Sequence, residues 1–250
     1  MSNAHHLSLT SRRFSSAWQW EEEAPIRRVE IEMSDSNWAA LIGDPTAEEY
    51  YEGTVSLVQD GEVLGTWHRV GVRFKGSVGS LGSCFRGNDG WGTSRDRCNK
   101  LSMKLKFNFV DASQTFFGLK RIMLHASMGD NSQLRERLGY SLFREMGIPT
   151  VRQQPIDVLV NTPSHRSDGP MGLHLLTETP DGRFTKAYFP GGDGNLYKQA
   201  WPGLVGPDAA RRYASLLVTN EDTASTDRMM AFTEALAAAS TDWDLVQVSL

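Results

Sequence analysis

Alternating apolar and polar positions predict β-strands through the first two thirds of the chain. In residues 27–33, Val29, Ile31 and Met33 alternate with charged side chains, which is the period of a half-buried strand. Residues 100–107 alternate even more regularly, with lysines and a serine between the apolar positions. The other predicted strands are residues 52–60, 67–75, 151–161 and 171–177. Asp60-Gly61 lies between two of them and predicts a hairpin turn.

Helical patterns dominate the later part of the chain. The strongest runs from Asp130 to Met146, where Leu134, Leu138 and Leu142 recur every four residues, so we expect these leucines to be buried against the sheet. The glycine and proline that follow predict its end. Residues 211–219 and 226–239 are predicted to be helical as well. Strands followed by helices indicate an α+β fold with an antiparallel sheet.

Composition limits the classes of function. The chain has 250 residues, which is enough for one large or two small domains. A net charge of −4 gives no field that would attract nucleic acid. No apolar run reaches the roughly 20 residues of a membrane-spanning helix, so we expect no membrane span. Seven scattered tryptophans do not form the stacking platform of a carbohydrate-binding module.

Two cysteines, Cys84 and Cys98, flank part of a glycine-rich segment. Neither has a CxxC neighbour or a nearby histidine, which argues against a structural zinc site. They are either two thiols or a disulfide that closes a loop of about 15 residues, worth roughly 3 kcal/mol. A disulfide would indicate an oxidising compartment.

Several short segments resemble the spore-coat protein H (CotH) kinase family. They are Val72-Arg-Phe-Lys-Gly-Ser77, Lys100-Leu-Ser-Met-Lys-Leu-Lys-Phe107, Phe117-Gly-Leu-Lys120 with Leu124-His125, Ser132 to Tyr140 with Met146-Gly-Ile-Pro149, Met171 to Glu178, and Gly194-Asn-Leu-Tyr-Lys198. Their order and spacing make the resemblance more specific than any one of them. His174 departs from it, since an aromatic residue is more usual there.

This resemblance implies the nucleotide-binding lobe of an atypical protein kinase, which transfers phosphate from ATP, with Mg or Mn, to Ser or Thr of a protein partner. We expect a tail at residues 1–24, the nucleotide-binding lobe at 25–200 and the beginning of a helical lobe at 201–250. The family's catalytic Asp–Asn motif and later metal-binding Asp are not found before Leu250. We therefore expect no catalytic or metal-binding residue in this chain and no phosphotransfer by this polypeptide alone.

The alternative function is a non-catalytic coat or cell-surface module that binds other proteins. The resemblance favours a spore or cell surface or another extracytoplasmic location, and a cytoplasmic one is also compatible with the composition.

Phosphoryl transfer requires cations against the phosphates, and the lysine-rich strand supplies candidates. Lys104 is central in it and is our first choice, followed by Lys100; the alternative is a solvated sheet face. The other candidates for binding the nucleotide are Arg73, Gly76, Arg135, Glu178 and Lys198. Backbone amides from Gly76 onward suit phosphate, although the segment is not a Walker A motif.

The acidic candidates remain open. Glu136 and Glu145 lie on the predicted helix, where a kinase-like lobe positions its lysine with a carboxylate, but each also fits an ordinary exposed helical charge. Glu178 ends a predicted strand and has either a cleft role or a turn-forming one.

Overall fold

The computed structural model describes residues 25–76, 100–127, 129–164, 171–198, 200, 206 and 208–239. Two compact units divide the chain, Met1–Thr179 and Pro180–Leu250. The lobe boundary expected at residue 200 stays a prediction, because compactness alone does not define a functional lobe. Cys84 and Cys98 lie outside the described residues.

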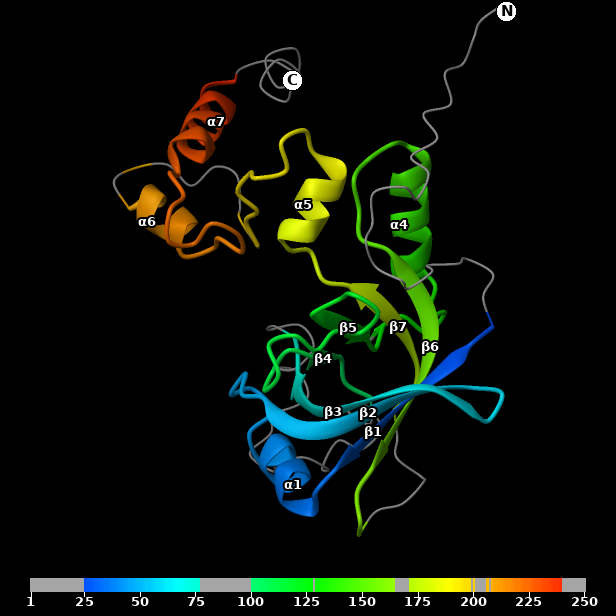
Figure 1. Ribbon diagram of the computed structural model, residues 1–250. Helices are drawn as coiled ribbons and strands as arrows, with labels where there is room; N and C mark the ends of the chain where they lie inside the picture. The colour runs from blue at the N-terminus through cyan, green and yellow to red at the C-terminus, as the bar shows by residue number, and fades with distance from the viewer. Residues whose placement is uncertain are drawn as a thin grey trace, which may run out of the picture. The chain divides into compact units, whose positions relative to one another are not determined.

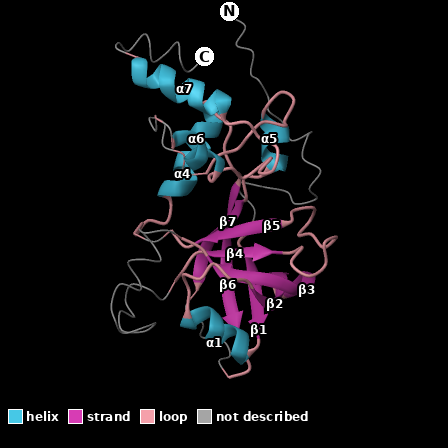
Figure 2. Cartoon of the chain, turned by 90° about the vertical axis from the view of Figure 1, so that its left-hand side faces the viewer, coloured by secondary structure: helices cyan, strands magenta, loops and turns pink. Residues whose placement is uncertain are grey.

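Seven strands of the first unit form a closed barrel in the order β1-β2-β3-β4-β5-β7-β6 (Figures 1 and 2). Their bounds are β1 Arg27–Met33, β2 Tyr51–Gln59, β3 Glu62–Phe74, β4 Met103–Lys106, β5 Arg121–His125, β6 Gln153–Asn161 and β7 Gly172–Glu178. All neighbours are antiparallel except β1 and β6, whose parallel pairing closes the sheet. Closure removes the unpaired edges that an open sheet would expose. The α+β class is confirmed, and the sheet is a barrel.

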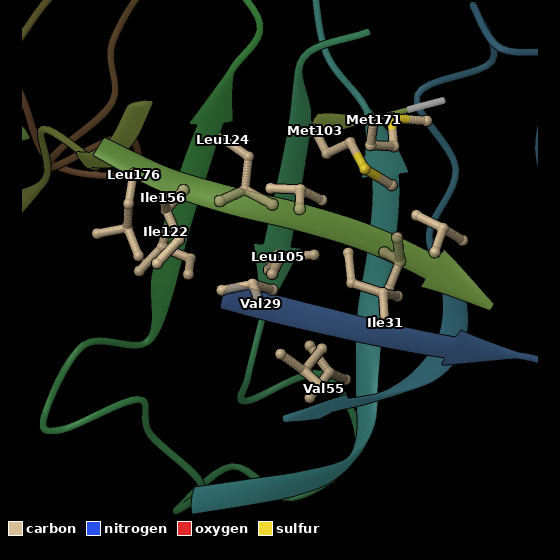
Figure 3. Packing of buried hydrophobic residues seen from close by; sticks show 14 of the residues in the cluster. Val29, Ile31, Val55, Met103, Leu105, Ile122, Leu124, Ile156, Met171 and Leu176 are labelled. Atoms are coloured by element: carbon tan, nitrogen blue, oxygen red, sulfur yellow. The ribbon is translucent and has the colours of Figure 1, made fainter. Parts of the chain in front are cut away.

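The inward positions of the strands fill the barrel with aliphatic side chains. Figure 3 shows Val29 and Ile31 of β1 facing Leu105, Ile122 and other residues of the opposite wall. These residues are the apolar half of the alternation in the sequence, so the period-2 pattern determined which side chains are inside. The predicted hairpin is also present, since Asp60 and Gly61 have φ of 52° and 84°, as a tight turn with two left-handed residues requires.

Helix α1 (Asp35–Gly43) lies at one end of the barrel and α4 (Arg135–Glu145) at the other (Figures 1 and 2). Ser34 caps α1 by accepting a hydrogen bond from the Asn37 amide. The start predicted for the second helix was wrong. Asp130 instead folds the preceding turn and accepts from the backbone amides of Ser132 and Arg135, so the helix begins five residues later.

The expected burial of the α4 leucines was also wrong. Leu134, Leu138 and Leu142 are 50%, 63% and 59% exposed. The physical reason is that α4 meets the barrel through polar side chains: Glu136 contacts strand residues, and Arg144 donates to the Val151 carbonyl. The periodicity correctly indicated an apolar face, but this face does not cover the barrel.

The second unit contains α5 (Gly182–Tyr188), α6 (Ala209–Ala214) and α7 (Asp227–Ala238). Asp181 caps α5 by accepting from the Arg183 amide, and Tyr213 of α6 is fully buried. Lys198 donates its backbone amide to the Leu216 carbonyl, and Val218 donates to Leu196, which joins two extended stretches. None of the helices in the described part of the chain is long and apolar enough to cross a membrane.

Candidate anion-binding site on the barrel

Four basic residues form a block on the outer surface of β3, β4 and β5, which we call the cationic face. Arg73 lies directly opposite Lys104, and Lys106 lies directly opposite Arg121. All four point outward because their strand neighbours, such as Phe74 and Met103, fill the barrel. Directly opposite residues have Cβ atoms about 4.5–5.5 Å apart, so like charges here repel one another. An anion placed between them would offset this repulsion.

Aromatic rings hold part of the cationic face in place. The Arg73 guanidinium lies 5.2 Å from the centre of the Tyr50 ring, and the Lys106 ammonium lies 5.7 Å from Tyr50 and 5.8 Å from Phe109. Both rings fit over Gly71, where an added Cβ would lie 2.8 Å from Phe109 and 3.0 Å from Tyr50. Glycine at this position is therefore required for the rings to pack against the strand.

Arg73 is largely enclosed by its neighbours. Its side chain is 11% exposed, and its guanidinium lies 3.2 Å from the Glu48 carboxylate. Glu48 itself is well exposed. In contrast, neither Lys106 nor Arg121 has a carboxylate partner within the described residues.

A chain of polar contacts lies beside the cationic face and links it to α4. The Lys75 ammonium is 2.8 Å from Nε2 of His125, and Nδ1 of the same ring is 2.5 Å from the Glu136 carboxylate. Gln153 donates to Glu136 at 2.6 Å and to the Thr177 hydroxyl at 3.0 Å. The result is a lysine connected to a helix carboxylate through one imidazole.

The two contacts of His125 fit one arrangement of hydrogen bonds. A charged ammonium has protons and no lone pair, so it donates to Nε2, which must then be unprotonated. Nδ1 therefore carries the proton and donates it to the Glu136 carboxylate.

The environment of Glu136 keeps this carboxylate ionised. Burial by itself raises the pKa of Glu136, but the contact with His125, the hydrogen bond from Gln153 and the charge of Lys75 together hold the pKa below its ordinary value. An ionised Glu136 fixes the imidazole, and the imidazole orients Lys75.

The register places this chain next to the cationic face. Lys75 follows Arg73 by two residues, and its amide donates to the Ser102 carbonyl, which continues the pairing of β3. His125 follows Met123 by two residues, and Met123 is directly opposite Lys104. Diagonal neighbours of this kind lie roughly 7–8 Å apart. Three cations, Arg73, Lys104 and Lys75, therefore share one surface.

The remaining candidates from the sequence have varied positions. Lys100 donates to the Gln133 side chain at 3.0 Å, and burial lowers the pKa of its ammonium. Gly76 follows Lys75 and has φ of 154°, in the range that favours glycine. Arg135 is 79% exposed and its ion pair is with Asp130, at 3.6 Å. Lys198 belongs to the second unit.

Glu178 is buried in an ion pair at the end of β7. Its two carboxylate oxygens accept from the Arg152 guanidinium at 2.8 and 3.0 Å, and the two backbones also exchange a hydrogen bond. Two fork-like hydrogen bonds make a strong, geometrically specific pair. The pair fixes the start of β6 to the end of β7, next to the division between the two units at Thr179.

Sequence reasoning missed His125 and the role of Lys75. Lys75 lies in the segment that carries the family resemblance, but the alternation gave no reason to prefer it to the other lysines. His125 ends a five-residue strand whose alternating Ile122 and Leu124 were a usable signal, although too short to separate from a helix turn. Only the fold brings Lys75, His125 and Glu136 together from three separate elements.

Two further properties of the described residues bear on the site. No group of three or more His, Cys, Asp or Glu side chains among them is arranged to hold a metal ion. An open groove of about 710 Å³ is lined by Arg28, Val58, Asp60 and other residues of β1, β2, β3, β6, β7 and the turn between β2 and β3, none of which belongs to the cationic face. The cationic face is a candidate site because of the charge and orientation of its side chains, not because of the size of a cavity.

Comparisons of the sequence with known proteins show the family of this chain. A family model described as "CotH kinase protein" matches residues 72–248, most of the chain. The chain is also similar to the "Inner spore coat protein H-like protein" of Bacillus subtilis (strain 168), with 27% identity over 97 residues. That match covers 35% of this chain and 30% of the Bacillus protein.

Proposed function

This chain belongs to the CotH kinase family, and we propose that its barrel binds the phosphates of ATP on the cationic face. The observation that carries the proposal is the outward pairing of Arg73 with Lys104, two like charges that share a surface with Lys75. An anion with several charges, such as a triphosphate, offsets repulsion among all three cations at once.

The connection from Lys75 to Glu136 supports a kinase-like lobe. Protein kinases hold the lysine that contacts the nucleotide phosphates with a glutamate on a neighbouring helix. Here the helix is α4 and the contact passes through His125. Lys75 and Lys104 bind phosphate oxygens, Glu136 and His125 orient Lys75, and the Gly76 amide lies next to Lys75 for a further contact.

The full reaction in this proposal is phosphate transfer from ATP to Ser or Thr of a protein partner. The bond between the γ-phosphorus and its bridging oxygen breaks, ADP leaves, and the acceptor hydroxyl forms the new bond and releases its proton. The metal that family resemblance implies, Mg or Mn, does not fit any carboxylate cluster of the described residues, so we assign it no ligands. Binding, rather than transfer, is what we expect of this polypeptide alone.

A second function has one specific observation in its favour. The exposed leucines of α4 fit a module that binds other proteins, and the relative from Bacillus subtilis carries a spore-coat name. A coat or surface module needs no nucleotide, so measured ATP binding distinguishes the two functions.

The test is a calorimetric titration of the 250-residue chain with ATP and with inorganic tripolyphosphate. We expect both ligands to bind competitively, and Lys104→Ala to weaken each at least tenfold, since a charged hydrogen bond is worth roughly 1.5–3 kcal/mol. His125→Gln should weaken ATP less, because it affects only the orientation of Lys75. Lys186→Ala, which removes an exposed cation of the second unit, is the charge-matched control. Equal affinities of wild type and Lys104→Ala would refute the assignment.

A further inference from the structure

Helix α4 carries an apolar stripe that nothing in the barrel covers. The stripe consists of Leu134, Leu138, Leu142 and Met146, at a spacing of four residues that places them along one side of the helix. The opposite side holds the polar contacts to the barrel, including Glu136 with His125. A helix normally turns its apolar side toward its own core, so the orientation of α4 is inverted.

The exposed apolar area of the stripe is large enough for a binding surface. Each of its four side chains is at least half exposed, and Phe143 and Ile148 beside it are 44% exposed. Together they present on the order of 500 Å² of apolar surface, a size at which patches on monomers commonly serve binding.

We propose that the stripe pairs with the same stripe of a second copy of this chain, with the two α4 helices antiparallel. The stripe is symmetric about Tyr140: Leu138 and Leu142 are equally distant from it, and so are Leu134 and Met146. A twofold axis perpendicular to α4, at the level of residue 140 and on the side of the stripe, therefore maps the stripe onto the same stripe of the second copy. The interface of a symmetric dimer requires this.

Charge selects the antiparallel direction. Arg135 is exposed in the first turn of α4 and Glu145 is exposed in the last. An antiparallel pair brings the arginine turn of one helix against the glutamate turn of the other, at both ends of the interface. A parallel pair would bring arginine against arginine and glutamate against glutamate, and would also align the two helix dipoles unfavourably.

The area of the interface indicates how tightly the two copies associate. Two stripes bury on the order of 1,000 Å², near the lower limit for a specific interface. The dimer is therefore expected to dissociate on dilution rather than to be permanent. This inference does not depend on nucleotide binding, and its test uses no nucleotide.

Sedimentation velocity of the 250-residue chain over a hundredfold range of concentration tests the proposal. We expect a reversible monomer–dimer equilibrium, which Leu138→Arg abolishes while the far-ultraviolet circular dichroism is unchanged. Leu64→Arg is the matched control, because Leu64 is an exposed leucine of β3, 46% exposed and outside the stripe. A wild type that stays monomeric throughout overturns the proposal. So does a Leu138→Arg variant that unfolds, since the stripe would then be covered within the chain.

Charge reversal tests the direction. Arg135→Glu and Glu145→Arg should each weaken the dimer several-fold, and the double variant should restore it, because opposite charges again face each other. The antiparallel arrangement is overturned if neither charge reversal changes the dissociation constant of the dimer. It is also overturned if the dimer of the double variant is weaker than that of either single variant.

Discussion

His174 should make the barrel sensitive to acid. The side chain is 1% exposed inside the barrel, with Nδ1 2.8 Å from the Gly172 carbonyl and Nε2 3.2 Å from the Leu101 carbonyl. Burial lowers the pKa of its imidazole from 6.5 to about 4, and the charge of Lys100 acts in the same direction. A neutral ring has one proton, so only one of the two carbonyls receives a hydrogen bond.

The direction and size of the change in folding stability with pH follow from these pKa values. As the pH falls from about 6.5 to about 4, the unfolded chain takes up a proton on His174 and the folded chain does not. Stability present above pH 6.5 is therefore lost over this window. A difference of about 2.5 in pKa corresponds to roughly 3 kcal/mol.

The measurement compares wild type with His174→Asn by urea unfolding at several pH values between 7.5 and 4. Asparagine is smaller and does not titrate, so it lowers stability at pH 7.5 but removes this acid-sensitive part. Other titrating groups are common to both proteins and cancel in the difference. The stability gap between the two should shift by about 3 kcal/mol in favour of His174→Asn as the pH falls. A gap that stays constant with pH would refute the reasoning.

Further variants test the packing by urea unfolding at pH 7.5. Glu178→Gln should cost about 3–5 kcal/mol because it removes the carboxylate charge that the buried Arg152 guanidinium faces, and most of the loss should return in Glu178→Leu combined with Arg152→Met; an equally unstable double variant would contradict this. Gly71→Ala should cost about 1–3 kcal/mol, since the new Cβ would collide with the two rings packed above it, and a neutral effect would remove the requirement for glycine. Leu124→Ala, inside the barrel, should cost about 2–5 kcal/mol, whereas Leu138→Ala in dilute solution should cost less than about 1 kcal/mol. The reverse order would mean that the stripe is buried within the chain.

Local patterns predicted the inside of the barrel better than its closure. The alternation in β1 identified Val29 and Ile31 as core residues because a strand exposes its two sides alternately to core and solvent. The same alternation contains no information on which strands are neighbours, so the parallel pairing of β1 with β6, more than 120 residues later, could not be foreseen.

Helix α4 shows a second property that the sequence pattern could not predict. A four-residue repeat establishes that a helix has an apolar side, but not what covers it, and here Glu136 on the other side meets the barrel. The site residues named from the sequence stay predictions. The lysine-rich strand led to Lys104 and its neighbours, whereas His125, a single residue at the end of a short strand, gained its partners only through folding.

The proposed binding of ATP at the cationic face can be tested with methionine methyl groups as probes. Met123 lies between Lys104 and Thr177 on the outer side of the sheet, whereas Met103 is fully buried inside the barrel. In a chain labelled with ¹³C at its methionine methyl groups, ATP should shift the Met123 resonance, assigned with Met123→Leu, in a saturable manner that Lys104→Ala weakens. The Met103 resonance should move little. A Met123 resonance that stays unchanged at ATP concentrations that saturate the chain would contradict binding at the cationic face.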